Sequence, residues 1–246
     1  MSLDNSVIAK KVFEYLNEVR INPKKALEDL MQVKQFYKDK FYCNPSLPVI
    51  IETKEGLAAV DDAIAFLQKQ APISKLTWED SLLKTSVPLL NHFEKQGSLS
   101  HGQGDSAFGK RIGEQNKSNA RLAENIGLGH NDPKEIVLHM IIDDGLNSRK
   151  NRINLFDLTF GKVGVAFGKH KEHRHACVIS FREENMKDLG SMEKYWIPKN
   201  QWPIDATSVE KHFEVIDEDS KRVVVAKFEF THANGTKSVQ TKEFKQ

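Results

Sequence analysis

The sequence predicts an α+β protein, in which a helix-rich part is followed by strands. Apolar residues recur at helical spacing along four stretches: 8–37, 56–70, 79–95 and 132–144. Two runs of alternating apolar and polar residues, 162–168 and 175–181, suit paired strands of one sheet. Three more alternating segments lie near the C-terminus, where a small antiparallel β meander is expected.

The N-terminal region is interpreted as two helices that meet at Asn22-Pro23. The residue before a proline avoids the helical region, so the first helix ends there and Pro23 opens the second. Residues 41–51 contain two prolines and are expected to form an extended connection. A third helix is predicted over 56–70, because its apolar residues share one stripe.

A fourth helix is predicted over 79–95, with Thr77 as its N-cap and Gly97 at its end. Pro88 lies inside this helix, where it should kink the backbone or require its hydrogen bonds to be satisfied otherwise. Residues 98–120 are rich in Gly, Ser, Asn and Gln, which predicts a long loop or a set of short turns. Loops of that length in a compact domain are often functional.

A short strand or turn around Glu124 leads into a helix that Asp132 caps, Pro133 opens and Gly145 ends. The basic segment 148–156 that follows is interpreted as a loop. Paired strands then complete the first domain, which is expected to span 1–184.

The C-terminal part is predicted to contain a linker arm over 185–207 and a three-stranded meander over 208–246. Three strands with one apolar face are near the minimum for independent order. The arm carries Trp196 and Trp202, which either pack on their own chain or form a protein-binding strip. The outer edges of the meander are open for strand addition by a partner.

The composition excludes some classes of function. The net charge of +2 provides no basic field, so no nucleic-acid partner is expected. The stretch MSLDNSVIAKKVF has no apolar signal region, and no segment approaches the roughly 20 apolar residues of a transmembrane span. Ser2 excludes N-myristoylation, which requires glycine. A cytoplasmic protein is expected, with Cys43 and Cys177 as free thiols.

Six motifs in order along the chain resemble the CAP superfamily, which comprises cysteine-rich secretory proteins, antigen 5 and pathogenesis-related proteins. The nearest variety is the SCP-like domain of bacteria and protists. The motifs are LNEVR, LTWEDSLLKTS, SHGQGDS around His101, AENIGLG around Glu124, IIDDG, and SRKNRINLF followed by FGKVGVAFGKH. They cover about 8–181. The resemblance implies an α/β/α sandwich with a cleft of two histidines and two acids, which in some members holds a divalent metal.

Carried over by motif, the cleft of this chain would contain His101, Glu124, Asp143 and Asn151. Asn151 stands where the family often has its second histidine. A carboxamide is a poor zinc ligand, and Lys150 beside it repels a cation. The cleft is therefore interpreted as a degenerate metal site. No cofactor is expected, with zinc on His101 and Glu124 as the alternative. If the four residues converge, Asn151→His should raise metal affinity.

Three roles remain open for His101 with Glu124: a hydrogen-bonded loop brace, a general-base pair, or part of a metal site. No activated nucleophile is evident near them, so no catalytic residue is assigned. Arg149 and Arg152 are expected to brace their loop by ion pairs with Asp143-Asp144. His139 is interpreted as a packed helix residue rather than a ligand.

The function expected from these features is a non-enzymatic, intracellular CAP-domain module that binds or supports a larger protein assembly. A cytoskeletal assembly is one candidate for the partner. Lipid or sterol binding is the first alternative, because the resemblance implies it for some members. A metal-assisted hydrolase is the second.

Overall fold

The computed structural model describes residues 4–97, 101, 108–113, 120–183, 201–218 and 221–245. The chain divides into two compact units, Met1–Glu184 and Asn185–Gln246. Within the described ranges, every helix is too short or too polar to span a lipid bilayer.

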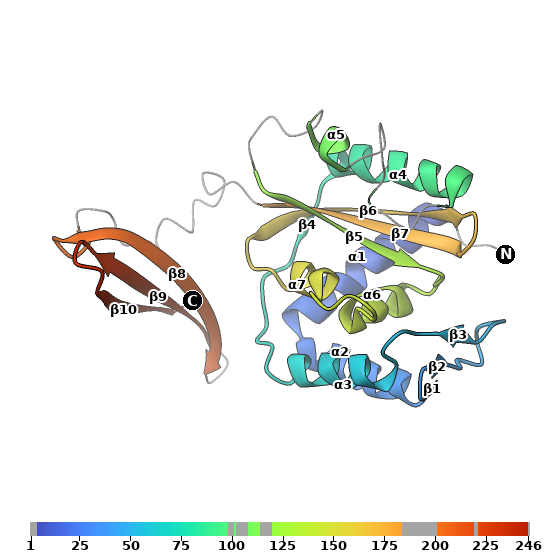
Figure 1. The fold of residues 1–246 in the computed structure, drawn as a ribbon, viewed down its shortest axis with the longest axis horizontal. Coiled ribbons are helices and arrows are strands. Elements are labelled where there is room, and N and C mark those ends of the chain that lie inside the picture. The colour runs from blue at the N-terminus through green and yellow to red at the C-terminus, as the bar shows by residue number, and fades with distance from the viewer. Residues whose placement is uncertain are drawn as a thin grey trace. The chain divides into compact units, whose positions relative to one another are not determined.

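The first unit combines helices with two sheets (Figure 1). Its described helices are α1 (Asn5–Ile21), α2 (Pro23–Lys34), α3 (Leu57–Leu67), α4 (Leu83–Gln96), α5 (Phe108–Gly113), α6 (Pro133–Ile142) and α7 (Lys150–Leu155). Its described strands are β1 (Tyr37–Lys38), β2 (Phe41–Tyr42), β3 (Ile51–Glu52), β4 (Thr77–Trp78), β5 (Leu122–Leu128), β6 (Phe160–His170) and β7 (Arg174–Glu183). A short 3-10 turn, η1 (Asp80–Leu82), leads into α4.

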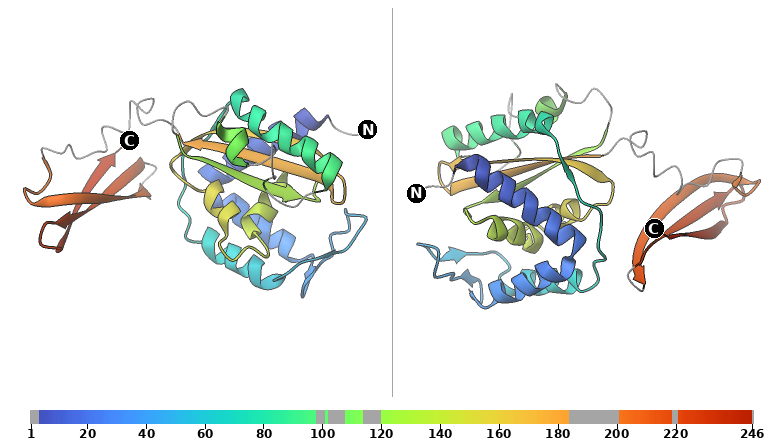
Figure 2. Two further views of the ribbon diagram at one scale, coloured as in Figure 1. Left: turned by 45° about the horizontal axis from the view of Figure 1, so that its top comes forward. Right: turned by 180° about the vertical axis from the view of Figure 1, so that it is seen from behind.

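A four-stranded sheet in the order β4-β6-β7-β5 forms the centre of this unit. β4 runs parallel to β6, whereas the β6–β7 and β5–β7 pairs are antiparallel. Figure 1 shows α4 and α5 on one face of the sheet and α1, α6 and α7 on the other. Both views in Figure 2 keep this separation, with α2 and α3 lying beyond α1 and α6. The α+β class and the sandwich implied by the resemblance are confirmed.

The two faces of the sheet are packed differently. On the α1 and α6 face lies the larger apolar core, which includes Leu16, Ile141 and Ile179. On the other face, η1 approaches the backbone of β6 closely, because a Cβ added at Gly164 would lie 2.7 Å from Leu82 Cβ. Thr85 and Ser86, near the start of α4, are buried.

Several predicted boundaries hold and others change. α1 ends before Asn22-Pro23, and Asp132 caps α6 by accepting from the backbone of Lys134 and Glu135. Thr77 is not a helix cap, because it pairs with β6 as part of β4, and α4 begins only after η1.

Three further local predictions need correction. The helix before Gly145 ends earlier, with Asp143 in the left-handed conformation at φ 56°. Segment 148–156 contains the short helix α7 instead of a continuous loop. Residues 41–51 contribute strands to a small sheet in the order β1-β2-β3.

The second unit is a three-stranded antiparallel sheet, as predicted. Its strands are β8 (Ala206–Glu218), β9 (Lys221–His232) and β10 (Lys237–Lys245), in the order β10-β9-β8. Phe228 and Phe230 are buried, and Trp202 packs on Phe230 edge to face at 5.8 Å between ring centroids. Intramolecular packing therefore accounts for Trp202, whereas Trp196 lies outside the described residues.

Candidate functional site

Glu124 of β5 is held by a buried arginine. Arg111 of α5 donates from Nη1 to Oε2 at 2.7 Å and from Nη2 to Oε1 at 2.8 Å. The side chains are 3% and 0% exposed, respectively. A two-pronged pair of this kind satisfies both carboxylate oxygens and fixes the orientation of both groups. The negative charge of Glu124 is therefore neutralised inside the protein.

His101 lies against the same carboxylate from the solvent side. Its Nδ1 is 2.9 Å from Glu124 Oε1, and its side chain is 54% exposed. The backbone carbonyl of His101 accepts from Arg111 Nη2 at 3.1 Å. Arg111 also donates to the backbone carbonyl of Thr85 in α4. Arg111 thus joins the loop containing His101, helix α4 and strand β5.

Hydroxyl groups near this pair bond to one another. Thr85 Oγ1 donates to Ser180 Oγ at 2.9 Å, and Ser86 Oγ lies 2.8 Å from the same atom. All three residues are buried. An activated nucleophile needs a base at hydrogen-bond distance and access to substrate. These hydroxyls are instead structural.

Asp143 and Asn151 form a second pair. The carboxylate of Asp143 accepts from the backbone of Asn151 at 2.8 Å and from Asn151 Nδ2 at 2.7 Å. It also accepts from the backbone of Arg152 at 3.3 Å. Burial raises the pKa of Asp143 above its ordinary value, although these hydrogen bonds act in the opposite direction. Asp143 therefore satisfies the first N–H groups of α7.

The two pairs lie on opposite faces of the sheet. Adjacent residues of a strand point to opposite faces. Glu124 contacts Arg111 on the α4 side, whereas its neighbour Asn125 donates to the backbone carbonyl of Asn151 at 2.9 Å. Among the described residues, no hydrogen bond or ion pair links His101–Glu124 to Asp143–Asn151. The four residues therefore form two separate pairs and do not converge on one site.

Arg149 and Arg152 brace their segment, but with other partners than the expected Asp143-Asp144. Arg149 holds Glu55 in a two-pronged pair, with both N–O distances 2.6 Å. Arg149 and Arg152 also bind Asp62 of α3, at 3.0 Å and 2.9 Å. The hydrogen bonds from Arg149 lower the pKa of Glu55 to about 2. The expected partnership is wrong because both aspartates accept backbone N–H groups instead.

These residues do not fit a divalent metal on Glu124. A guanidinium is permanently charged and already uses both oxygens of the carboxylate, so a cation there faces direct repulsion. Lys150, which was expected to repel a cation beside Asn151, is exposed on α7. Sequence reasoning missed Arg111, because a single arginine in a polar, glycine-rich stretch carries no signal of its partner.

His139 packs against neighbouring rings on α6, in keeping with its interpretation as a packed helix residue. Its ring stacks on that of His130, with centroids 3.9 Å apart and planes at 18°. Glu135 lies one helical turn before His139 on α6. The combination of a histidine before the helix cap and an i,i+4 Glu–His pair is the signal that sequence reasoning left unused.

A family model described as the cysteine-rich secretory protein family, CAP, matches residues 13–181. That span is more than half of the 246 residues. Neither the curated proteins nor the solved structures gave a match. The family match agrees with the ordered motifs and with the sheet that α4 covers on one face and α1 and α6 on the other. The chain belongs to the CAP family of cysteine-rich secretory proteins.

Proposed function

We propose that this protein is a non-enzymatic CAP module that binds or supports a larger protein assembly. The observation that carries the proposal is the buried Arg111–Glu124 pair. It places a permanent internal cation on the acid of the family cleft, so this carboxylate is not available to a metal or as a base. The cleft acts as an internal brace between α4, α5 and β5.

The second unit supplies the surface for a partner. In the described sheet, which has the order β10-β9-β8, β8 and β10 are the edge strands, and each pairs only with β9. An unpaired strand edge offers backbone donors and acceptors that an extended segment of another protein can add to. A filament-forming, cytoskeletal protein is the candidate partner. The free thiols Cys43 and Cys177 support an intracellular assignment, because disulfides are rare in reducing compartments.

Capture from the native extract tests this proposal. The tagged full-length chain should retain a partner, and the captured material should co-sediment with filaments. Val239 of β10 is 49% exposed, so Val239→Lys places a charge on the edge strand without disturbing the core. Val49→Lys is the matched control in the first unit, where Val49 is 53% exposed. Equal capture by both variants would contradict strand addition at β10.

A groove beside α1 and α4 supports lipid binding as a second candidate function. Its volume is about 620 Å³, and Trp78, Leu83, Val87 and Phe167 contribute to its lining. Lys10 and Lys169 also line it, but Asp80 and Glu94 balance their charge, so its apolar lining carries the argument. The groove lies outside the Arg111–Glu124 pair. An acyl chain or a sterol would bury apolar surface there.

Flotation with anionic and sterol-containing liposomes distinguishes the two candidates. Robust co-flotation of the full chain, lost in Val87→Asp but kept in Val49→Asp, would establish lipid binding. Both valines are exposed, at 43% and 53%, so neither change should unfold the protein. Absence of the chain from the liposome fraction would remove the lipid function.

A further inference from the structure

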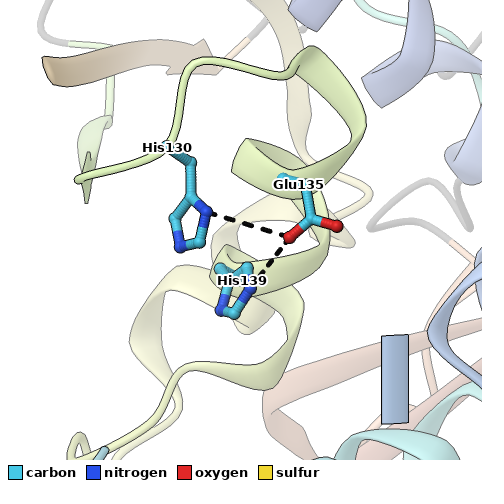
Figure 3. A group of neighbouring side chains, drawn as sticks. All are labelled: His130, Glu135 and His139. Atoms are coloured by element: carbon cyan, nitrogen blue, oxygen red, sulfur yellow. Dashed lines mark ion pairs between the residues drawn. The ribbon is translucent and has the colours of Figure 1, made fainter. Parts of the chain in front are cut away.

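Three potential ligand side chains meet at the start of α6 (Figure 3). His130 lies between β5 and α6, two residues before the helix cap Asp132. Glu135 and His139 are four residues apart on α6, so they occupy the same side of the helix. Figure 3 shows the ion-pair lines from both rings converging on one oxygen of Glu135. We name these three residues the His–Glu–His cluster.

The distances within the cluster match those around a small metal ion. His139 Nε2 is 3.2 Å from Glu135 Oε2, and His130 Nδ1 is 3.8 Å from the same oxygen. One ligand atom from each residue lies within 4.8 Å of the other two. Ligand bonds of about 2.0–2.1 Å to tetrahedral zinc place neighbouring ligand atoms roughly 3.3 Å apart. The distance from His139 Nε2 to Glu135 Oε2 is close to this spacing, and the distance from His130 Nδ1 to the same oxygen is somewhat longer.

Two buried ring nitrogens of the cluster lie near Glu135 Oε2 but form no hydrogen bond of acceptable geometry. Among the described residues, neither His130 Nδ1 nor His139 Nε2 has one, and both atoms are buried. His130 as a residue is 8% exposed. Buried polar atoms without partners are uncommon in folded proteins and call for an explanation. A packed core histidine would donate to a carbonyl or carboxylate, whereas these two atoms face a shared carboxylate oxygen without hydrogen-bond geometry.

Residues outside the cluster hold Glu135 in place. Tyr42 donates its hydroxyl to Glu135 Oε2 at 2.5 Å. Asn44 Nδ2 lies 3.0 Å from the Tyr42 hydroxyl oxygen and 3.4 Å from Glu135 Oε1. The Tyr42 ring meets His139 edge on, at 4.8 Å between centroids. Outer hydrogen bonds of this kind orient the ligands of metal sites.

A pocket leads to the cluster from outside. Its volume is about 270 Å³, and His130, His139, Met140 and Asp143 are among the residues that line it. A metal bound by three protein groups keeps a further position for water or a small ligand. The pocket gives this position a route to solvent.

We propose that the His–Glu–His cluster binds a divalent transition-metal ion of the zinc type, with its open position facing the pocket. Two imidazoles and one carboxylate suit Zn²⁺ and not the hard ion Mg²⁺, which prefers oxygen ligands. The site uses none of the residues of the Arg111–Glu124 pair, so it is independent of the proposed binding function.

Titration calorimetry on the chelator-treated full chain tests the proposal. Wild-type protein should bind one Zn²⁺ per chain, and Mg²⁺ should produce no binding heat. Glu135→Gln and His139→Gln should each weaken Zn²⁺ binding by about 100-fold or more, because losing a ligand exceeds the 10–100-fold cost of losing an outer partner. His101→Gln is the matched control and should leave the affinity unchanged.

Two further measurements guard against trivial results. Zn²⁺ should raise the melting temperature of the wild type but not of Glu135→Gln, which shows that the variant folds yet lacks the site. Visible spectra of the Co²⁺-loaded chain should have the intense bands of four-coordinate cobalt. Absence of Zn²⁺ binding by the wild type would overturn the proposal. Binding that survives both Glu135→Gln and His139→Gln, or that only His101→Gln removes, would also overturn it.

Discussion

Glu124 and Glu135 are two acidic side chains of the same unit, but their surroundings differ in one decisive respect. Glu124 lies against the buried guanidinium of Arg111 at 2.7 and 2.8 Å. Glu135 faces two imidazoles, one of which burial keeps neutral. A carboxylate with a permanent internal cation has its charge balanced by the fold itself. The Glu135 carboxylate has no guanidinium partner of this kind and accepts from the Tyr42 hydroxyl instead.

Removing the internal cation should have the largest effect. Arg111→Met leaves Glu124 buried and without its charge partner, which should lower the free energy of unfolding by about 3–5 kcal/mol. Urea denaturation monitored by circular dichroism measures this difference. Lys34→Met is the matched control, because the Lys34–Asp61 pair is exposed and should contribute less than about 1 kcal/mol. Equal losses in the two variants would show that the Arg111–Glu124 pair has no special weight.

Removing the hydrogen bond from Tyr42 to Glu135 should have an intermediate effect on Zn²⁺ affinity. Tyr42→Phe removes the hydroxyl that holds Glu135 Oε2 at 2.5 Å. Zn²⁺ affinity should fall by about 10-fold, since outer partners typically contribute 10–100-fold. Calorimetry measures the change, and Tyr15→Phe, which removes a hydrogen bond to Asp29 on another part of the unit, serves as the control. Unchanged affinity in Tyr42→Phe would mean that Glu135 needs no support.

Acid should weaken the pair between Arg149 and Glu55, a second carboxylate held by an arginine. Arg149 lowers the pKa of Glu55 from 4.5 to about 2. A depressed carboxyl pKa contributes stability above the unfolded value, and this contribution is lost as pH falls from about 4.5 toward 2. Because Glu55 is partly exposed, the contribution should stay below about 1 kcal/mol. The free energy of unfolding, measured from about pH 6 to about pH 3, should depend less on pH in Glu55→Gln than in the wild type. Superimposable profiles would contradict the assignment.

The smallest effect is expected at the family position of the second histidine. Asn151 uses its side chain to hold Asp143 at 2.7 Å, on the other face of the sheet from Glu124. Asn151→His alone should therefore leave Zn²⁺ affinity within about 2-fold of the wild type, because Arg111 still occupies Glu124. A large gain in calorimetry would show that His101, Glu124 and residue 151 can converge despite Arg111.

The helices and the meander follow from local pattern, and most were predictable. Asn22-Pro23 ends α1, and Asp132 caps α6, because proline geometry and side-chain capping act over a few residues. The errors arise where distant contacts decide. Thr77 looks like a cap, yet pairing with β6 makes it a strand residue. Segment 148–156 lacks helical apolar spacing, yet Asp143 supplies the acceptor that starts α7.

The candidate site was less predictable than the fold. His101 and Glu124 were identified from motifs, and they lie 2.9 Å apart. Arg111 and His130 were missed, because their roles depend on partners that no short motif contains. Arg149 and Arg152 were expected to pair with Asp143-Asp144, but they form ion pairs with Glu55 and Asp62.

The sequence by itself determined the family, the α+β class and the C-terminal meander. Only the tertiary structure decided which charges meet. Helix and strand patterns depend on spacing within a segment, whereas a buried ion pair or ligand cluster depends on elements brought together by packing. Packing places Arg111 on Glu124 and leaves Glu135 to His130 and His139.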